Sequence, residues 1–228
     1  EMIGAARRHG RVAYPITALR DLLAELGAGN PVIVLQNLGL PWEPRWHFAV
    51  VVGYDLLEEE IVLHSGTEPR EVLSLRHFER TWEESEYWGL LVLPPSTLPA
   101  TVSEIRFLEA VIGLERSRRW QAVAQAYGTA LARWPASLGA LMGLGNSRYA
   151  LGDLVGAEQA FRQATEAHPR AAPAFNNLAH VLAELERRQE AILLARRAVA
   201  LGGPLVTTYR TTLEELRGEK PLARFSTE

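Results

Sequence analysis

The pattern of apolar and polar residues changes near residue 95. Before it, short runs of apolar, often β-branched residues alternate with amphipathic segments; after it, small and apolar residues recur with helical spacing. The first pattern predicts a domain of mixed helices and strands, and the second predicts an all-α domain. We therefore expect a domain at residues 1–95, a proline-containing linker at 96–103 and a helical domain at 104–228.

Four apolar runs in the first domain have the length and composition of β-strands. Apolar residues at helical spacing predict one helix that ends in glycine and a second in which Phe78 and Trp82 share a face. Asp55 begins a short polar stretch between two of the strands, and we interpret it as a turn residue of a hairpin. The expected strands are residues 31–38, 47–55, 60–66 and 89–95, and the expected helices are residues 15–29 and 74–85.

The helical half repeats itself. Pro135 and Pro169 stand 34 residues apart, and three series of apolar residues keep that spacing. These series are Tyr127, Phe161 and Ala195; Ala130, Ala164 and Ala198; and Val123, Ala157 and Ala191. The pattern resembles the tetratricopeptide repeat, in which pairs of helices stack into a superhelix. The resemblance implies three units over residues 104–204, with residues 206–218 as a capping helix.

The resemblance to tetratricopeptide repeats implies that this half binds an extended peptide or a protein partner. Asn146 and Asn177 fall in the first helices of adjacent units, where such residues often contact the ligand backbone. Alternatively, asparagine stands there only because it belongs to the repeat pattern. Met142 occupies a place where carboxylate-binding repeats carry lysine, so capture of a C-terminal carboxylate is not expected. The array could also dock on the first domain.

The composition argues against several classes of ligand and of covalent or metal stabilisation. The net charge of −3 gives no general attraction for nucleic acid, and the apolar runs are shorter than the roughly 20 residues of a membrane-spanning helix. The six histidines show no ligand spacing, so neither a metal nor another cofactor is expected. The chain contains no cysteine, which excludes disulfides and thiolate metal sites.

The order of motifs in residues 15–95 resembles the C-terminal part of a papain-like fold. The relevant family is the cysteine peptidases related to the double-glycine (bacteriocin-processing) leader peptidases. A helix is followed by "GAGNPVIVLQN", then by His47 at the head of "HFAVVVGYD", a hairpin, the strand end "LHSG" and the helix "HFERTWEE". The resemblance implies an α+β papain-like domain, present in part, followed by the tetratricopeptide superhelix.

In such peptidases a histidine takes the proton of a cysteine thiol, and the resulting thiolate attacks the amide carbonyl. The resemblance implies that His47 is this general base. Ser65 stands in the place of the aspartate that usually orients the imidazole. Asn37, Trp42 and Trp46 would line the substrate cleft, although the tryptophans could equally be ordinary packing residues.

The missing cysteine leaves three interpretations. Because the chain starts at Glu1 rather than at methionine, we expect that a segment upstream supplies the nucleophile and that the chain as given is inactive. Otherwise, the first domain is a degenerate peptidase fold within a non-catalytic scaffold or adaptor. The third interpretation is an unrelated α+β binding domain in which His47 is merely buried. The resemblance favours the bacterial cell envelope as the location.

Overall fold

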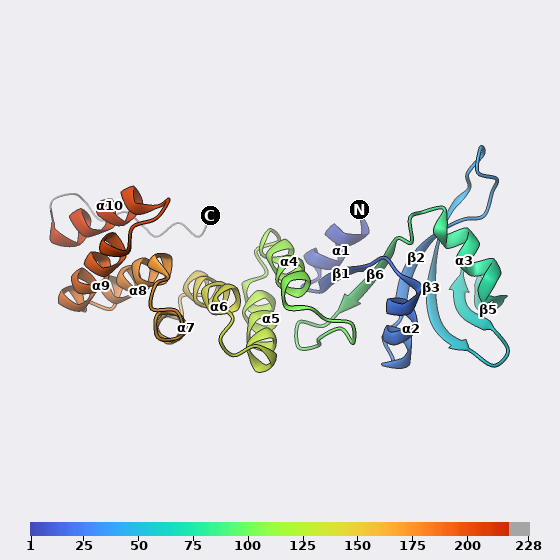
Figure 1. The fold of residues 1–228 in the computed structure, drawn as a ribbon, viewed down its shortest axis with the longest axis horizontal. Coiled ribbons are helices and arrows are strands. Elements are labelled where there is room, and N and C mark those ends of the chain that lie inside the picture. The colour runs from blue at the N-terminus through green and yellow to red at the C-terminus, as the bar shows by residue number, and fades with distance from the viewer. Residues whose placement is uncertain (219–228) are drawn as a thin grey trace. The chain divides into compact units, whose positions relative to one another are not determined.

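The computed structural model describes residues 1–218 and divides into two compact units, residues 1–117 and the residues from Arg118 onward. The first unit is an α+β domain built on one sheet, and the second is all-α (Figure 1). This confirms the predicted order of fold classes. The first unit extends past the expected boundary at residue 95, because residues 96–103 and the helix that follows them belong to it.

A six-stranded antiparallel sheet forms the centre of the first unit. Its strand order is β1-β6-β2-β3-β4-β5, so that strands distant in sequence, β1 and β6, pair at one edge. A β-bulge between Val51 and Gly53 interrupts the pairing of β3 with β4. The strands are β1 (Val12–Ile16), β2 (Val32–Asn37), β3 (Trp46–Asp55), β4 (Glu60–Ser65), β5 (Glu68–Ser74) and β6 (Gly89–Leu93).

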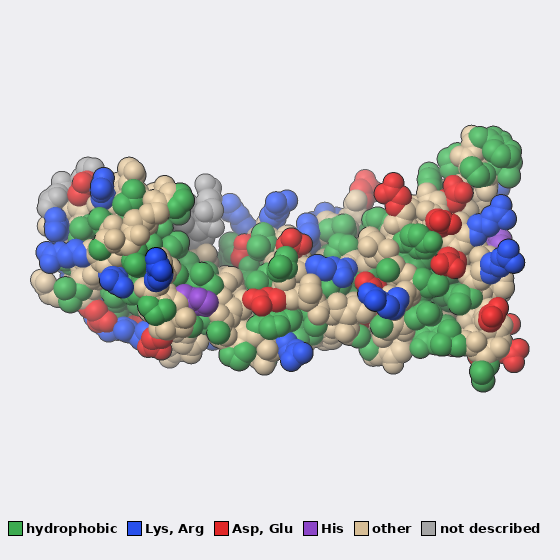
Figure 2. Space-filling view, viewed as in Figure 1, with side chains coloured by type: hydrophobic (Ala, Val, Ile, Leu, Met, Phe, Trp, Pro, Cys, Tyr) green, Lys and Arg blue, Asp and Glu red, His purple; other side chains and the backbone are tan. Residues whose placement is uncertain are grey.

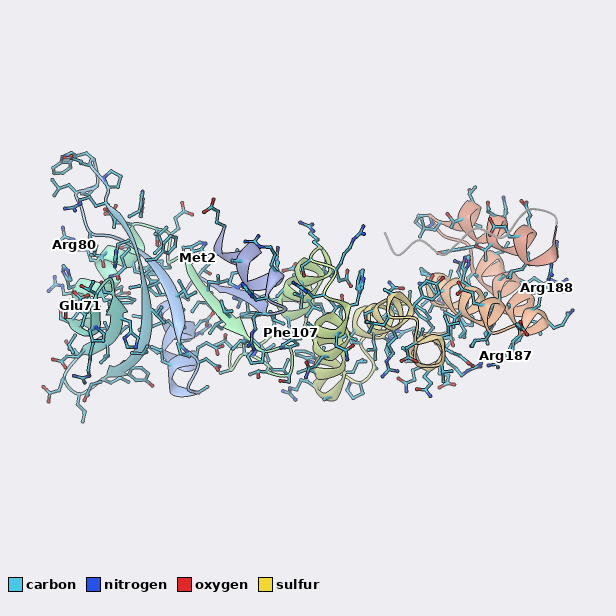
Figure 3. All side chains as sticks on the ribbon, turned by 180° about the vertical axis from the view of Figure 1, so that it is seen from behind. Met2, Glu71, Arg80, Phe107, Arg187 and Arg188 are labelled. Carbon is cyan, nitrogen blue, oxygen red and sulfur yellow. The ribbon has the colours of Figure 1, made fainter. Side chains whose placement is uncertain are left out.

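Helices pack on both faces of this sheet. On one face, α2 (Leu19–Gly27) and α3 (Leu75–Glu83) cover β2 to β5, and a hydrogen bond from Gln36 Nε2 to Thr81 Oγ1 of 2.8 Å ties β2 to α3. On the other face, α1 (Met2–Arg8) packs on β1, and Met2 (Figure 3) lies against the hydrophobic cluster that contains Ala13 and Leu90. Since side chains alternate along a strand, each strand contributes to both layers.

Residues 96–103 connect the sheet to α4 (Glu104–Glu115) and are fixed by one carboxylate. Glu25 of α2 is fully buried and accepts hydrogen bonds from Ala100 N at 3.0 Å, Thr101 N at 2.8 Å and the Thr101 hydroxyl at 2.7 Å. Asn30 Nδ2 donates to the same carboxylate at 2.8 Å. These four bonds satisfy a group that would be costly to bury alone, and they explain why the expected linker belongs to the sheet unit.

The sequence patterns located the four apolar strands and missed three other elements. The expected helix over 15–29 begins only at Leu19, because residues 12–16 form β1. Pro15 lies in this edge strand, where an absent N–H costs no ladder bond. The charged strand β5 and the short helix α1 also lacked a clear periodic signal. The hairpin turn behaves as predicted, because Asp55 Oδ1 accepts from Leu57 N at 2.8 Å.

The second unit is a row of helices in antiparallel pairs. Val123, Tyr127 and Phe161 are buried, as are all the alanines of the repeating series. The repeat depends on close helix contact: a side chain at Gly145 would lie 2.4 Å from the Phe161 ring. The described helices are α5 (Trp120–Arg133), α6 (Leu138–Ala150), α7 (Leu154–Ala167), α8 (Ala172–Glu184), α9 (Arg188–Leu201) and α10 (Val206–Arg217).

Candidate functional site

His47 and Ser65 lie side by side in the sheet unit. His47 Nε2 is 3.0 Å from Ser65 Oγ, and both residues are partly buried. The sheet register explains the contact, because Ala49 pairs with Ser65 and His47 lies two residues before Ala49 on the same face of β3. The structure therefore brings together the two residues that the sequence assigned to a base and to its orienting partner.

A serine hydroxyl and an imidazole can exchange one hydrogen bond in either direction, depending on the imidazole tautomer. Such a bond fixes the ring orientation. It does not stabilise an imidazolium as a carboxylate would, because the hydroxyl carries no charge. The pair thus has the geometry of a positioned base without the electrostatic support of a complete triad.

Asn37 has a different surrounding from the one expected. It is buried at the base of the β2–β3 hairpin, where its Oδ1 accepts from Gly39 N at 2.9 Å and from Arg45 N at 2.8 Å. A side chain at Gly39 would lie 2.4 Å from Glu43 O, so the loop closes only with glycine there. The contacts of Asn37 are those of a residue that shapes the hairpin.

The two tryptophans lie on this hairpin and face solvent. Trp42, at the tip, is 79% exposed and Trp46 is 51% exposed. Leu38 and Leu40 are each half exposed beside them. Hydrophobic side chains gather at this protruding loop between β2 and β3 (Figure 2). An exposed apolar group of this size is typical of an interaction surface.

In the repeat unit, polar side chains connect the first helices of successive pairs. Asn177 Nδ2 of α8 donates to Asn146 Oδ1 of α6 at 3.3 Å. His180 Nε2 of α8 is 3.0 Å from Thr212 Oγ1 of α10. The structure thus brings together the two predicted asparagines and adds a second polar pair on the same helices.

His180 was missed by sequence reasoning, although its position offered a signal. It lies three residues after Asn177, which places both side chains on one face of α8. Burial lowers the pKa of His180 below its ordinary value of 6.5, against the opposing influence of Glu215 and Glu184. Glu184 also accepts a hydrogen bond from the Tyr149 hydroxyl of α6. The polar row therefore runs across α6, α8 and α10.

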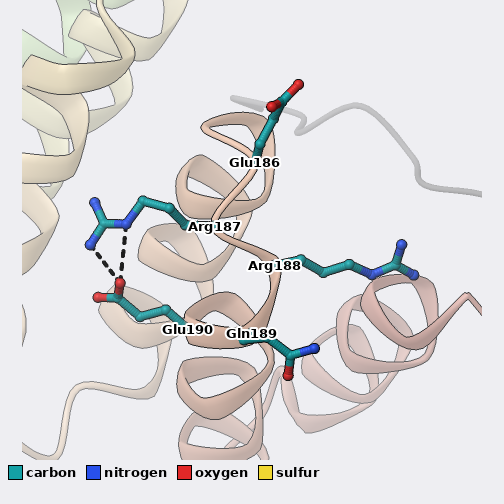
Figure 4. A pocket seen from close by; sticks show the side chains of 5 residues that line it. All are labelled: Glu186, Arg187, Arg188, Gln189 and Glu190. Carbon is teal, nitrogen blue, oxygen red and sulfur yellow. Dashed lines mark hydrogen bonds and ion pairs between the residues drawn. The ribbon is translucent and has the colours of Figure 1, made fainter.

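A cluster of charged side chains connects α7 with the N-terminal end of α9. Arg162 Nη2 is 2.8 Å from both Glu158 Oε1 and Glu190 Oε1, and Arg187 Nη1 is 2.7 Å from Glu158 Oε1. Burial of Glu158 opposes ionisation, but the hydrogen bonds from Arg162 and Arg187 outweigh it and lower its pKa. A shallow concavity of about 380 Å³ adjoins this cluster (Figure 4). Arg187 and Glu190 already pair with each other, and Arg188 Nε donates to Leu216 O at 2.7 Å, so we assign the concavity no ligand.

Within residues 1–218, no group of three or more His, Cys, Asp or Glu side chains could hold a metal ion. None of the helices in the described part of the chain is long and apolar enough to cross a membrane.

The Tetratricopeptide repeat family model matches residues 108–172 and 146–204. The C-terminal half carries tetratricopeptide repeats. The match covers the units expected over 104–204 and begins within α4, whereas the sheet of the first unit lies outside it. No peptidase family matches that sheet domain, so the peptidase resemblance gains no support from this comparison. No curated protein matches the chain.

Solved structures with helical repeats are similar to part of the chain. The Yersinia enterocolitica type III secretion chaperone SycD, in complex with a peptide of the translocator YopD, is 15% identical over 52% of this chain and 96% of its own, with a TM-score of 0.48. A tetratricopeptide protein of Thermus thermophilus is 27% identical over 49% of this chain and 64% of its own, with a TM-score of 0.44. The Sgt2 tetratricopeptide domain of Aspergillus fumigatus is 17% identical over 55% of this chain and 89% of its own, with a TM-score of 0.44.

Proposed function

We propose that this chain is a non-catalytic binding protein whose tetratricopeptide repeats hold an extended segment of a partner along α6, α8 and α10. The polar row on these helices carries the proposal. Repeat arrays of this kind use extended surfaces for binding, and residues at equivalent places in successive units recur along such a surface. His180 stands 34 residues after Asn146, at the equivalent place of the next unit, and Asn177 lies one turn before it on α8.

The chemistry of the row suits a peptide backbone. An asparagine amide offers a donor and an acceptor, and the bond between Asn177 and Asn146 engages one polar atom of each. The second polar atom of each amide can bind an N–H or C=O group of an extended ligand. Met142, at the place where a lysine would select a terminal carboxylate, packs against the hydrophobic core of the repeat unit. The proposed ligand is therefore an internal segment rather than a free C-terminus.

The test begins with peptides selected against the full chain from a random-sequence display library. Calorimetry then compares wild type with Asn177→Ala and with Gln163→Ala, an exposed change on α7 away from the row. Loss of a ligand hydrogen bond should weaken binding by about tenfold in Asn177→Ala and leave Gln163→Ala unchanged. Equal affinities for the three proteins, or selected peptides that bind only the sheet unit, would contradict the proposal.

The contact between His47 and Ser65 favours a second candidate, a cysteine peptidase-like activity of the sheet unit. In this proposal His47 is the general base and Ser65 orients it, while Trp42 and Trp46 contact the substrate. Asn37 supports them by shaping the hairpin. Because the sequence has no cysteine, a separate polypeptide segment would have to supply the thiolate.

This candidate is tested on the longest natural form of the polypeptide. If that form contains a cysteine, its alkylation by iodoacetamide should slow when His47 is replaced by alanine, because the thiol loses the base that deprotonates it. The control is His64→Ala, an exposed histidine on the neighbouring strand. A form without cysteine, or equal alkylation rates in both variants, would contradict the activity.

A further inference from the structure

The two faces of the sheet differ in how completely helices cover them. Under α2 and α3, five apolar residues of the central strands are at most 2% exposed; they are Val34, Ala49, Val51, Ile61 and Leu63. On the opposite face, α1 packs with Ala13, Leu90, Ile33 and Trp88. These contacts lie on β1, β6, the first half of β2 and the segment just before β6. The rest of that face is more exposed.

The exposed part of this face forms one apolar surface. We call it the open strip and define it as Leu35, Phe48, Val50, Val62 and Val72. Register and alternation place these five residues on the α1 side, because Leu35 pairs with Phe48, Ile33 with Val50, and Val62 with Val72. Phe48 is 47% exposed and Val72 is 39% exposed, while Leu35, Val50 and Val62 are partly buried. Uncovered side chains of this size on neighbouring strands indicate a binding surface.

We propose that the open strip is the docking site for an amphipathic α-helix of a partner protein. The strip continues the surface on which α1 already packs, and the Phe48 ring meets the Trp88 ring edge-on at 5.7 Å where the two areas join. Four strands, β2 to β5, span about 14 Å at their usual spacing. That width suits one helix of about 10 Å diameter lying beside α1.

Neighbouring polar groups define the chemistry of the helix. His64 pairs with Val50 and lies on the same face, and alternation places Arg70 there as well. Both are exposed at one end of the strip, while Glu60 lies on this face at the opposite end. A helix with an aliphatic face and a carboxylate near His64 and Arg70 would bury the strip and pair with these groups. A second copy of the sheet fits less well, because α1 stands on the same face.

The probe is a synthetic helix of about 14 residues, with leucines on one face and glutamates elsewhere. Its binding to the full chain is measured by fluorescence anisotropy against a peptide of the same composition in scrambled order. We expect the helical peptide to bind and the scrambled one to fail. A leucine–lysine version should bind more weakly, because it places like charge near Arg70.

Substitution identifies the surface. Phe48→Lys and, independently, Val72→Lys should each weaken binding at least about tenfold, whereas Ile105→Lys, at an exposed apolar residue of α4, should not. Circular dichroism verifies that each variant is folded, and Val72→Lys keeps the test open if Phe48→Lys unfolds. The proposal is overturned if the peptide does not bind or if all variants bind equally. The proposal would also be overturned if the protein formed a dimer that Phe48→Lys dissociates. Binding of phosphatidylcholine vesicles instead of the peptide would overturn it as well.

Discussion

The two units differ in the sequence separation of the residues that contact each other. In the repeat unit, the polar contacts between successive helix pairs join residues 28 to 35 positions apart, as in Arg162 with Glu190, Asn146 with Asn177 and Tyr149 with Glu184. In the sheet unit, Tyr14 bonds to Thr101 over 87 positions and Arg106 bonds to Pro15 over 91. A contact that recurs at the repeat period can be found in the sequence. A contact that occurs once, between distant segments, cannot.

The cores differ in the same way. The repeat unit buries many alanines around Phe161 and Tyr127, so its helices approach closely and each pair reproduces the one before. The sheet unit fills its interior with larger side chains, among them Trp82, Tyr14 and Phe78. Close packing of small residues makes the repeat unit sensitive to added volume, whereas the sheet unit depends more on a few irreplaceable polar contacts.

The largest expected effect follows from that contrast. Gly145→Val would place new atoms against the Phe161 ring, and we expect the repeat unit to lose about 3 kcal/mol of unfolding free energy. Gly128→Val is the matched control, because a side chain at Gly128 meets nothing within 4 Å. Scanning calorimetry should show a lower unfolding temperature for the repeat unit only. Equal unfolding temperatures for the two variants would refute the close-packing argument.

A smaller effect is expected in the sheet unit. Glu25→Gln replaces one acceptor oxygen of the buried carboxylate by a donor that faces other donors, namely Ala100 N, Thr101 N and the Thr101 hydroxyl. We expect a loss of about 2 kcal/mol, measured by urea unfolding of the sheet unit. The exposed Glu109→Gln should change little. If both substitutions had the same effect, the carboxylate would not fix residues 96–103.

The smallest effect concerns pH. Because burial lowers the pKa of His180 below 6.5, the unfolded chain binds a proton more readily than the folded chain does. The stability of the repeat unit is therefore fully present above about pH 6.5 and declines as the pH falls through the lower pKa of the folded state. His180→Gln should reduce this decline in thermal scans, whereas the exposed His77→Gln should not. An unchanged pH profile in His180→Gln would contradict the assignment.

The sequence predicted the repeat unit more completely than the sheet unit. The repeat period predicted the buried residues Tyr127 and Phe161 and the capping helix α10, because each repeating contact appears more than once in the chain. In the sheet unit, the apolar strands were predictable from their composition. The edge strands β1 and β5 were not, since Pro15 and the charges of β5 obscure the strand pattern.

The candidate sites were predicted unevenly. The contact between His47 and Ser65 follows from the expected hairpin, which brings the two strands into register. The position of Asn37 could not be anticipated, because its role depends on how the loop 38–45 folds back on it. The incomplete cover of one sheet face was equally hidden, since alternation gives both faces of β3 apolar residues and does not show where α1 ends.

The bonds of Asn37 have a consequence for protease sensitivity. An exposed loop tip is the usual place where a protease cuts a folded protein. In the β2–β3 hairpin the amides of Gly39 and Arg45 are held by the Asn37 side chain, and Leu38 N donates to Arg45 O at 2.9 Å. A protease would have to break these bonds before the segment could enter its active site in an extended form. The most exposed tryptophan of the sheet unit thus belongs to a segment that resists cleavage while the protein is folded.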